Sequence, residues 1–347
     1  MRPLYVLACF VLLSGLLLIW SYILRAIWTK TSKLRSLLMK VSLSVSTIIY
    51  LFLVVEFLFY SSFAVSDTFG FTLASKRWEA KYWRPTNSFG YRDVEHNPAE
   101  LRNKKVLFVV GDSFVAGHGI SQTENRFSNI LQRNLAGQYV VVNIARNGWN
   151  TADEYQAIVS YPYKPKKIIL SYYINDILGA AFKLGYGSPI RVEPPPNRTL
   201  RYLTDHSYAL NFTYWRLYRF YNKDLGEKYW EFLKSSYSNR NIWEEHEAEL
   251  FKIVTYTQSQ GIDLTVVVFP NLMAVEASAV FTSKVAEFFQ KHNVRVLNLE
   301  PILVDREPMS LVVNSLDAHP NEALNREVAE LLTKEIQAEP SSSETAK

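Results

Sequence analysis

Five short apolar segments lie in the last two thirds of this 347-residue chain, and they limit its fold more than any other feature. They span residues 105–110, 139–144, 167–173, 263–269 and 294–299. Each is apolar along most of its length instead of alternating with polar residues, which is typical of parallel strands covered on both faces. Amphipathic helical patterns separate them, among them 244–260, 278–291 and 322–337. This order predicts an α/β fold: a doubly wound, flavodoxin-like three-layer sandwich with a central parallel sheet of about five strands.

Two helix starts have the spacing of capping boxes, Ser121 with Glu124 and Thr151 with Glu154. The first would open a helix that ends near Gly137 and buries one apolar face. These are predictions of where two of the helices between the strands begin.

The N-terminal region contains two long apolar stretches, residues 3–24 and 41–65, the second broken only by Glu56. About 20 apolar residues cross a bilayer as a helix. Only Arg2 precedes the first stretch and no good cleavage site follows it, so we expect a retained transmembrane helical hairpin, a two-helix anchor over 1–66. Glu56 would either contact another membrane protein or lie near the outer interface.

The loop between the two apolar stretches is basic. It carries Arg25, Lys30, Lys33, Arg35 and Lys40 and no acidic residue. By the positive-inside rule this loop faces the cytoplasm, so both ends of the hairpin face outward. We therefore expect a multi-pass protein of the cell (inner) membrane whose α/β domain is extracytoplasmic, in the periplasm.

Composition excludes several function classes. The net charge of +5 comes partly from the basic loop, and no Lys/Arg run with interleaved aromatic residues suggests nucleic acid as a partner. Cys9 is the only cysteine, and the six histidines lack ligand spacing. The sequence therefore predicts no metal and no cofactor.

The remaining chain divides by composition into three parts. Residues 67–104 form an aromatic-rich lead-in, residues 105–337 the α/β domain with an insertion at about 177–243, and residues 338–347 a polar tail expected to be disordered. The aromatic residues of the insertion either stack on sugars or acyl chains or pack its helices against the sheet or the membrane surface. His118 and His206 are most simply loop or packing residues.

Gly111-Asp112-Ser113 directly follows the first apolar strand segment, and Asp317-Ala318-His319 lies near the end of the chain. A serine hydroxyl becomes a nucleophile when an oriented base takes its proton. His319 can be that base and Asp317 can orient it, because Pro320 favours an extended backbone at His319, in which both side chains project to one side. The NH groups of Ser113 and Gly148 and the amide of Asn175 are candidate oxyanion donors.

These motifs resemble the SGNH (GDSL-like) hydrolase superfamily, in particular its membrane-anchored bacterial members, over roughly residues 105–337. The matching residues are Gly-Asp-Ser-Phe at 111–114, Asn-Gly at 147–148, Asn-Asp at 175–176 and Asp-Ala-His-Pro at 317–320. The resemblance implies that Ser113 is the nucleophile, that Gly148 and Asn175 build the oxyanion hole and that His319 is the base. Two departures stand out: Tyr173 replaces a family glycine, and the last block is Asp-x-His instead of the commoner Asp-x-x-His.

The resemblance implies a membrane-anchored serine esterase or O-acyltransferase that works through an acyl-serine intermediate, on O-acylated (O-acetylated) envelope glycan or a small ester. A lipase or thioesterase that takes lipid from the adjacent bilayer is one alternative. A catalytically inactive partner subunit of a multi-spanning membrane acyltransferase is another, and Tyr173 keeps it open.

Overall fold

The structure, a computed structural model, describes residues 2–27, 33–68, 70–188 and 192–338. The chain divides into two compact units. One, the hairpin unit, comprises Met1–Ala64, Thr72–Ala74 and Glu193–Tyr221. The other, the sheet unit, comprises Val65–Phe71, Ser75–Val192 and Asn222–Lys347.

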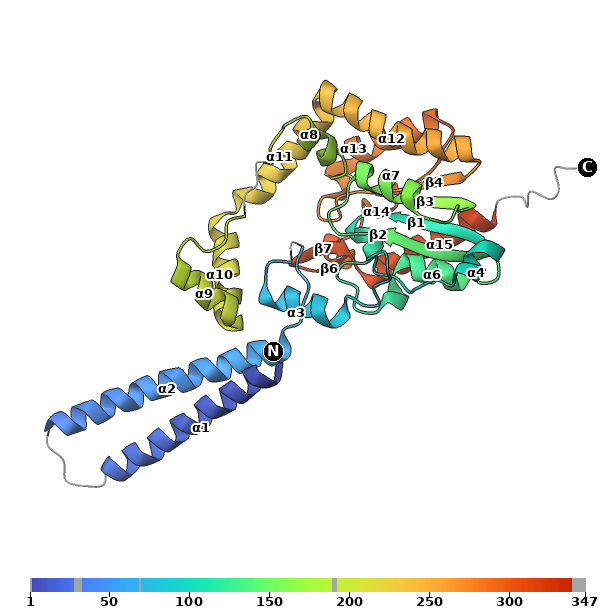
Figure 1. Ribbon diagram of the computed structural model, residues 1–347. Coiled ribbons are helices and arrows are strands. Elements are labelled where there is room, and N and C mark those ends of the chain that lie inside the picture. The colour runs from blue at the N-terminus through green and yellow to red at the C-terminus, as the bar shows by residue number, and fades with distance from the viewer. Residues whose placement is uncertain (1, 28–32, 69, 189–191, 339–347) are drawn as a thin grey trace, which may run out of the picture. The chain divides into compact units, whose positions relative to one another are not determined.

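The sheet unit is built on five parallel strands in the order β2-β1-β3-β4-β5, which is the flavodoxin-like order (Figure 1). The predicted parallel α/β sheet is thus confirmed, and every strand lies within one residue of its predicted bounds. The strands are β1 (Lys105–Gly111), β2 (Tyr139–Ala145), β3 (Lys167–Tyr173), β4 (Asp263–Phe269) and β5 (Arg295–Asn298).

Helices cover both faces of this sheet, which explains why its strands are apolar throughout. Phe108 and Val110 of β1 belong to one buried cluster, whereas Leu107 and Val109 belong to the other. The first face is covered by α7 (Thr151–Ser160), α8 (Ile177–Lys183), α11 (Asp224–Ser238), α12 (Arg240–Gln260) and much of α13 (Val275–Lys291). The second is covered by α5 (Ser113–Ala116), α6 (Phe127–Asn134), α14 (Glu300–Leu303) and α15 (Glu322–Gln337).

Both predicted capping boxes are wrong. Asn150, not Thr151, caps α7: its side chain accepts from Ala152 N (3.0 Å), and Asp153 Oδ2 accepts from Asn150 N (3.2 Å). Asparagine is the stronger N-cap residue of the pair, so the helix starts one residue earlier than the Thr-x-x-Glu pattern predicts. At the other position a 3₁₀ turn (Thr123–Asn125) forms, and α6 begins without a side-chain cap.

The carboxyl edge of the sheet is joined by a small antiparallel hairpin, β6 (Val312–Asn314) and β7 (Asp317–Pro320). Two lead-in helices, α3 (Leu73–Tyr82) and α4 (Pro98–Asn103), precede β1. Residues 339–347, most of the tail predicted to be disordered, lie outside the described residues.

The hairpin unit contains the two N-terminal helices, α1 (Arg2–Ile27) and α2 (Lys33–Ser62), which pack on each other. Cys9, Leu16 and Ile23 are buried and recur every seven residues, the spacing of a helix–helix seam. Within the described residues, one stretch is long and apolar enough to cross a membrane, Lys40–Ser62 in α2; the apolar part of α1, Leu12–Arg25, is shorter. The side chains of several early residues of α1 lie outside the description.

Two helices of the predicted insertion, α9 (Arg198–His206) and α10 (Tyr208–Tyr221), also belong to the hairpin unit, where α10 packs on α2. The other two, α8 and α11, belong to the sheet unit and pack on α12.

Candidate active site

Ser113 lies at a sharp strand-to-helix turn. β1 ends at Gly111, Asp112 caps α5 by accepting from Phe114 N (2.9 Å), and Ser113 is the first helical residue. A Cβ at position 111 would lie 2.6 Å from Val115 Cγ2, so only glycine fits this turn. The turn therefore presents the Ser113 hydroxyl at the carboxyl edge of the sheet, where doubly wound folds bind their ligands.

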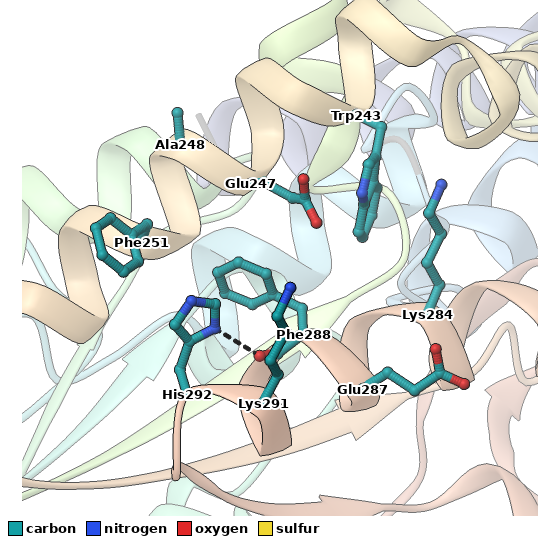
Figure 2. Close-up of a pocket in the computed structure, with 9 residues that line it drawn as sticks. All are labelled: Trp243, Glu247, Ala248, Phe251, Lys284, Glu287, Phe288, Lys291 and His292. Atoms are coloured by element: carbon teal, nitrogen blue, oxygen red, sulfur yellow. Dashed lines mark hydrogen bonds between the residues drawn. The ribbon is translucent and has the colours of Figure 1, made fainter.

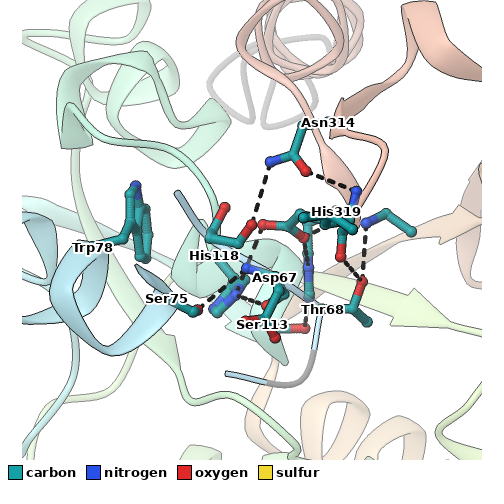
Figure 3. Close-up of polar contacts among 12 residues, drawn as sticks. Asp67, Thr68, Ser75, Trp78, Ser113, His118, Asn314 and His319 are labelled. Carbon is teal, nitrogen blue, oxygen red and sulfur yellow. Dashed lines mark hydrogen bonds and ion pairs between the residues drawn. The ribbon is translucent and has the colours of Figure 1, made fainter. Parts of the chain in front are cut away.

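A hydrogen-bond path joins Ser113, His319 and Asp317 (Figure 3). Ser113 Oγ lies 2.8 Å from His319 Nε2, and His319 Nδ1 lies 2.5 Å from Asp317 Oδ1. Asp317 Oδ1 also accepts from the backbone NH of His319 (3.2 Å), which fixes the carboxylate beside the ring. β7 supplies both residues, and the extended backbone of that strand brings their side chains together.

The partners determine the tautomer of His319. An ionised carboxylate only accepts, so Nδ1–H donates to Asp317 and Nε2 is left to accept the Ser113 proton. Asp317 is fully buried, and burial raises the pKa of this carboxyl group, but the hydrogen bond and charge of His319 outweigh burial and bring the pKa below its ordinary value. Asp317 is therefore ionised at neutral pH, and the path has the proton arrangement of a serine hydrolase.

A second histidine, His118, packs against the pair and was expected only to be a loop or packing residue. Its ring centroid is 4.5 Å from that of His319, and its Nε2 is 3.8 Å from Asp317 Oδ2. Nε2–H donates to the Asp67 carbonyl (2.9 Å), so Nδ1 accepts from the side-chain amide of Asn147 (3.0 Å). Burial, and next the charge of His319, lower the pKa of His118, so the ring is neutral.

The segment that follows α2 supports the β6–β7 hairpin. Thr68 N donates to the Leu316 carbonyl (2.9 Å), and the Thr68 hydroxyl accepts from Ala318 N (3.1 Å). Ala318 stands between the two β7 residues of the hydrogen-bond path. A segment only a few residues beyond α2 thus fixes the strand that presents Asp317 and His319.

The candidate oxyanion residues lie in loops at the same edge of the sheet. Gly148 has φ of +78°, a left-handed conformation that favours glycine, and its neighbour Asn147 is the residue bound to His118. The Asn175 side chain hydrogen-bonds Tyr229 of α11, and its Oδ1 has no hydrogen-bond partner among the described residues.

Tyr173, where the resembling family has glycine, packs beside the turn that contains Ser113. Its ring stacks on Phe114 with centroids 4.4 Å apart, and Phe114 also contacts the His319 ring at 5.5 Å. Burial raises the pKa of the Tyr173 hydroxyl well above its ordinary value, so the side chain is neutral. Tyr173 therefore adds aromatic packing under the turn and leaves the Ser113–His319 contact intact.

Three potential metal ligands, His118, Asp317 and His319, have donor atoms within 4.8 Å of one another. Their ring nitrogens are already engaged: His118 binds Asp67 and Asn147, and His319 binds Asp317 and Ser113. The arrangement fits proton transfer better than metal ligation, since a metal would have to displace these hydrogen bonds.

A groove of about 570 Å³ lies elsewhere, between α12 and α13 (Figure 2). Its wall includes Lys291 and His292, which lead into the start of β5, so it lies toward the amino edge of the sheet. The Lys284 ammonium covers the Trp243 ring at 4.0 Å. None of the site residues predicted from the sequence lines it. The lining residues are Trp243, Glu247, Ala248, Phe251, Lys284, Glu287, Phe288, Lys291 and His292.

Comparisons with known proteins give only distant likenesses. No family model matches the chain, and no curated protein matches it. Among solved structures it is similar to a member of the lipolytic G-D-S-L family from Veillonella parvula (14% identity, TM-score 0.40, covering 68% of this chain and 100% of that one). It is also similar to the esterase EstA from Pseudoalteromonas (13%, 0.40, 67% and 97%) and a carbohydrate acetylesterase family member from Sinorhizobium meliloti (12%, 0.39, 67% and 97%). TM-scores this low establish no family, so the functional argument rests on the contacts of Ser113, His319 and Asp317.

Proposed function

We propose that this protein is an SGNH-type serine esterase or O-acyltransferase that works through an acyl-enzyme on Ser113. The observation that carries the proposal is the hydrogen-bond path from Ser113 Oγ through His319 to a buried, ionised Asp317. A structural serine does not need a base oriented by a second buried group, whereas a nucleophilic serine does.

In the first half of the reaction, Ser113 Oγ attacks the ester carbonyl carbon while His319 Nε2 takes the hydroxyl proton. Asp317 stabilises the resulting imidazolium. When the tetrahedral intermediate collapses, the carbonyl–alkoxy bond breaks and His319 returns the proton to the departing alcohol. In the second half, His319 deprotonates water or an acceptor hydroxyl, whose oxygen attacks the acyl carbon. The bond from that carbon to Ser113 Oγ then breaks, and His319 returns the proton to Oγ.

The oxyanion is proposed to be stabilised by the backbone NH groups of Ser113 and Gly148 and by the side-chain amide of Asn175. Each residue lies just past the carboxyl end of a strand in the same sheet. The bond between Asn147 and His118 supports this role for Gly148, because it fixes the preceding residue. Asn175 would exchange part of its contact with Tyr229 for the substrate oxygen.

We also propose that α1 and α2 anchor the protein as a membrane hairpin. Large apolar side chains face outward on both helices: Leu18 is 70% exposed on α1 and Ile48 is 66% exposed on α2. Such surfaces are unfavourable in water, at about 25 cal/mol for each Å² of apolar area, and favourable in lipid. The basic loop would face the cytoplasm, which leaves the catalytic residues outside it, in the periplasm.

The resemblance favours an O-acylated, in particular O-acetylated, envelope glycan or a small ester as substrate. A second candidate substrate, an ester in the adjacent bilayer, is favoured by the short connection between the anchor and the site. Asp67, which binds His118, is five residues beyond Ser62, and five extended residues reach at most about 18 Å.

The test uses the purified full-length chain in detergent micelles, with p-nitrophenyl acetate and longer-chain esters, each with and without an oligosaccharide acceptor. Ser113→Ala should remain folded and lose at least about 10³-fold in kcat. Ser160→Ala, which changes an exposed helical serine, is the matched control. A fluorophosphonate probe should label the wild type and the control but not Ser113→Ala. Folded Ser113→Ala protein that keeps within about tenfold of wild-type turnover would exclude Ser113 as nucleophile.

A further inference from the structure

Glu56 near the end of α2 is a buried carboxylate, only 4% exposed. It accepts hydrogen bonds from Tyr208 N (2.6 Å), Ala209 N (3.0 Å) and the Ser207 hydroxyl (2.7 Å). Tyr208 and Ala209 open α10, and the first NH groups of a helix lack partners within it and lie at its positive end. The partner of Glu56 is thus this chain's own α10. The sequence alone suggested a contact with another membrane protein or a position near the outer interface.

Aromatic contacts extend this junction along the last two turns of α2. Phe212 packs on Phe59 and Phe63, with ring centroids 5.1 and 5.7 Å apart. Tyr208 packs edge-on against Tyr60 at 5.3 Å. The first two turns of α10 are therefore fixed beside residues 56–63 of α2.

The position of this junction along α2 sets its depth in a bilayer. The apolar stretch Lys40–Ser62 has 23 residues, about 34 Å of helix, slightly longer than a hydrocarbon core of about 30 Å. Glu56 precedes Ser62 by six residues, which is about 9 Å. With this stretch centred in the bilayer, Glu56 lies about 7 Å inside the outer boundary of the hydrocarbon core, a depth to which interfacial helices insert their apolar faces. If α2 spans the membrane, α10 therefore begins at the outer headgroup–acyl boundary.

The sides of α9 and α10 away from this junction expose large apolar side chains. Phe220 is 59% exposed and Tyr221 is 78% exposed, and Leu217 shares their face because it lies three and four residues before them. Patches of this kind mark a binding surface. We use the name membrane-surface face for the exposed apolar residues that cluster at helical spacing on each of the two helices: Leu200 and Leu203 on α9, and Leu217, Phe220 and Tyr221 on α10.

The charge of the two helices suits anionic lipid. Residues 193–221 contain four arginines, at 198, 201, 216 and 219, against Glu193 and Asp205, so the segment has a net charge of +2. Each basic residue near an anionic membrane surface contributes about 1 kcal/mol of attraction. Tyrosine and phenylalanine beside arginine are typical of helices that lie in the interface.

We propose that α9 and α10 lie on the outer surface of the membrane, with the membrane-surface face in the lipid headgroup layer and the Glu56 junction holding them there. The proposal rests on the membrane attachment through α2 proposed above. It identifies a surface for lipid, separate from the catalytic residues.

The test labels single cysteines with an environment-sensitive dye in a full-length Cys9→Ser background, reconstituted into vesicles of phosphatidylcholine and phosphatidylglycerol. Leu217→Cys and Leu203→Cys report on the membrane-surface face. Val45→Cys, on the outward side of α2, reports on the span, and Lys252→Cys, exposed on α12, is the matched control. Nitroxide lipids quench the dye from a shallow or a deep position.

We expect shallow nitroxides to quench the dye at 217 and 203 more than deep ones do, deep nitroxides to quench it at 45, and neither to quench it at 252. If the dye at position 45 is quenched and the dyes at positions 217 and 203 are not, the proposal is overturned, and the membrane-surface face would instead bind a protein partner. Absence of quenching at 45 would instead refute the membrane span, and the proposal would fall with it. Esterase activity of the same samples reports on the catalytic proposal independently.

Discussion

Replacing Asp317 with asparagine tests the central contact of the proposed mechanism. The substitution keeps size and shape but removes a charge that is present throughout the neutral pH range, because the pKa of Asp317 lies below its ordinary value. It also replaces one acceptor oxygen with an NH₂ donor. The outcome depends on which atom of the new amide faces His319 Nδ1.

The backbone NH of His319, which donates to Oδ1, favours the amide oxygen in that position, whereas the far side of the carboxylate favours the NH₂ group there. On the other side of the carboxylate, His118 Nε2 lies 3.8 Å from Oδ2, and its proton is already donated to Asp67. His118 therefore offers no acceptor to an amide NH₂ group, whereas His319 Nδ1 can accept. His319 would then carry its proton on Nε2 and could no longer accept the Ser113 proton.

This loss of the correct tautomer costs about 10⁴ in kcat in the Ser-His-Asp enzymes for which it is known, about 5 kcal/mol of transition-state stabilisation. We expect a fall of that order in kcat for p-nitrophenyl acetate with little change in KM, and His319→Ala should be at least as impaired. Ser66 bears on the size of the fall, because its hydroxyl lowers the pKa of Asp317 and could also accept from the amide. A smaller fall that deepens in the Ser66→Ala, Asp317→Asn double variant would still support the tautomer argument.

The assay compares kcat and KM of the full-length variants in micelles, with circular dichroism and size-exclusion chromatography to check the fold. Asp224→Asn, which changes an exposed aspartate in the first turn of α11, should keep wild-type activity. If folded Asp317→Asn keeps more than about a tenth of wild-type kcat, the carboxylate does not orient the base, and the reasoning is refuted.

Three further outcomes follow from the structure. His118→Phe keeps a ring against Trp78 but removes the hydrogen bond to Asn147, so kcat should fall about 10- to 100-fold with KM little changed. His118→Gln should recover part of the lost kcat. A variant that loses folding stability but keeps wild-type kcat would contradict a positioning role. Burial lowers the pKa of His246 to about 3, so at this residue the unfolded chain binds one proton more between about pH 6.5 and 3. From pH 7 to 5 the unfolding free energy of the wild type should therefore fall by about 2 kcal/mol relative to that of His246→Gln, measured by urea titration at both pH values. A reporter fused after Lys347 should behave as extracytoplasmic and one inserted at Thr31 as cytoplasmic, and the reverse pattern would invert the proposed topology.

The sheet could be predicted from the sequence because its signal is local. Lys167–Tyr173 and Asp263–Phe269 have their predicted bounds, since a strand buried on both faces must be apolar along its whole length and polar residues mark its ends. The caps were less predictable. At the start of α7 two neighbouring residues, Asn150 and Thr151, could each cap the helix, and small differences in their ability to accept from the first NH groups decide the outcome.

Part of the site could also be predicted from the sequence, because its signals are local. Ser113, Gly148 and Asn175 each follow a strand, so a parallel sheet gathers them at one edge, and a single residue separates Asp317 from His319 in an extended segment. The role of His118 was not readable. Its contact with Asp67 joins residues 51 positions apart, and the contact of Thr68 with Ala318 joins residues 250 apart, so neither leaves a periodic pattern.

Arg92 extends this long-range support to the other side of the site. Its buried guanidinium donates to the carbonyls of Gly117 (2.5 Å) and Ile120 (2.7 Å), the loop that contains His118, and to that of Tyr82 (2.8 Å). Burial lowers the pKa of Arg92 to about 9, so it is still charged at neutral pH and forms strong hydrogen bonds to these carbonyls. The loop after α5 and the strand that contains Asp317 and His319 are thus both held by residues that precede β1. Because these contacts join the residues before β1 to both sides of the site, substitutions between α2 and β1 should alter the positions of Ser113 and His319 through these hydrogen bonds.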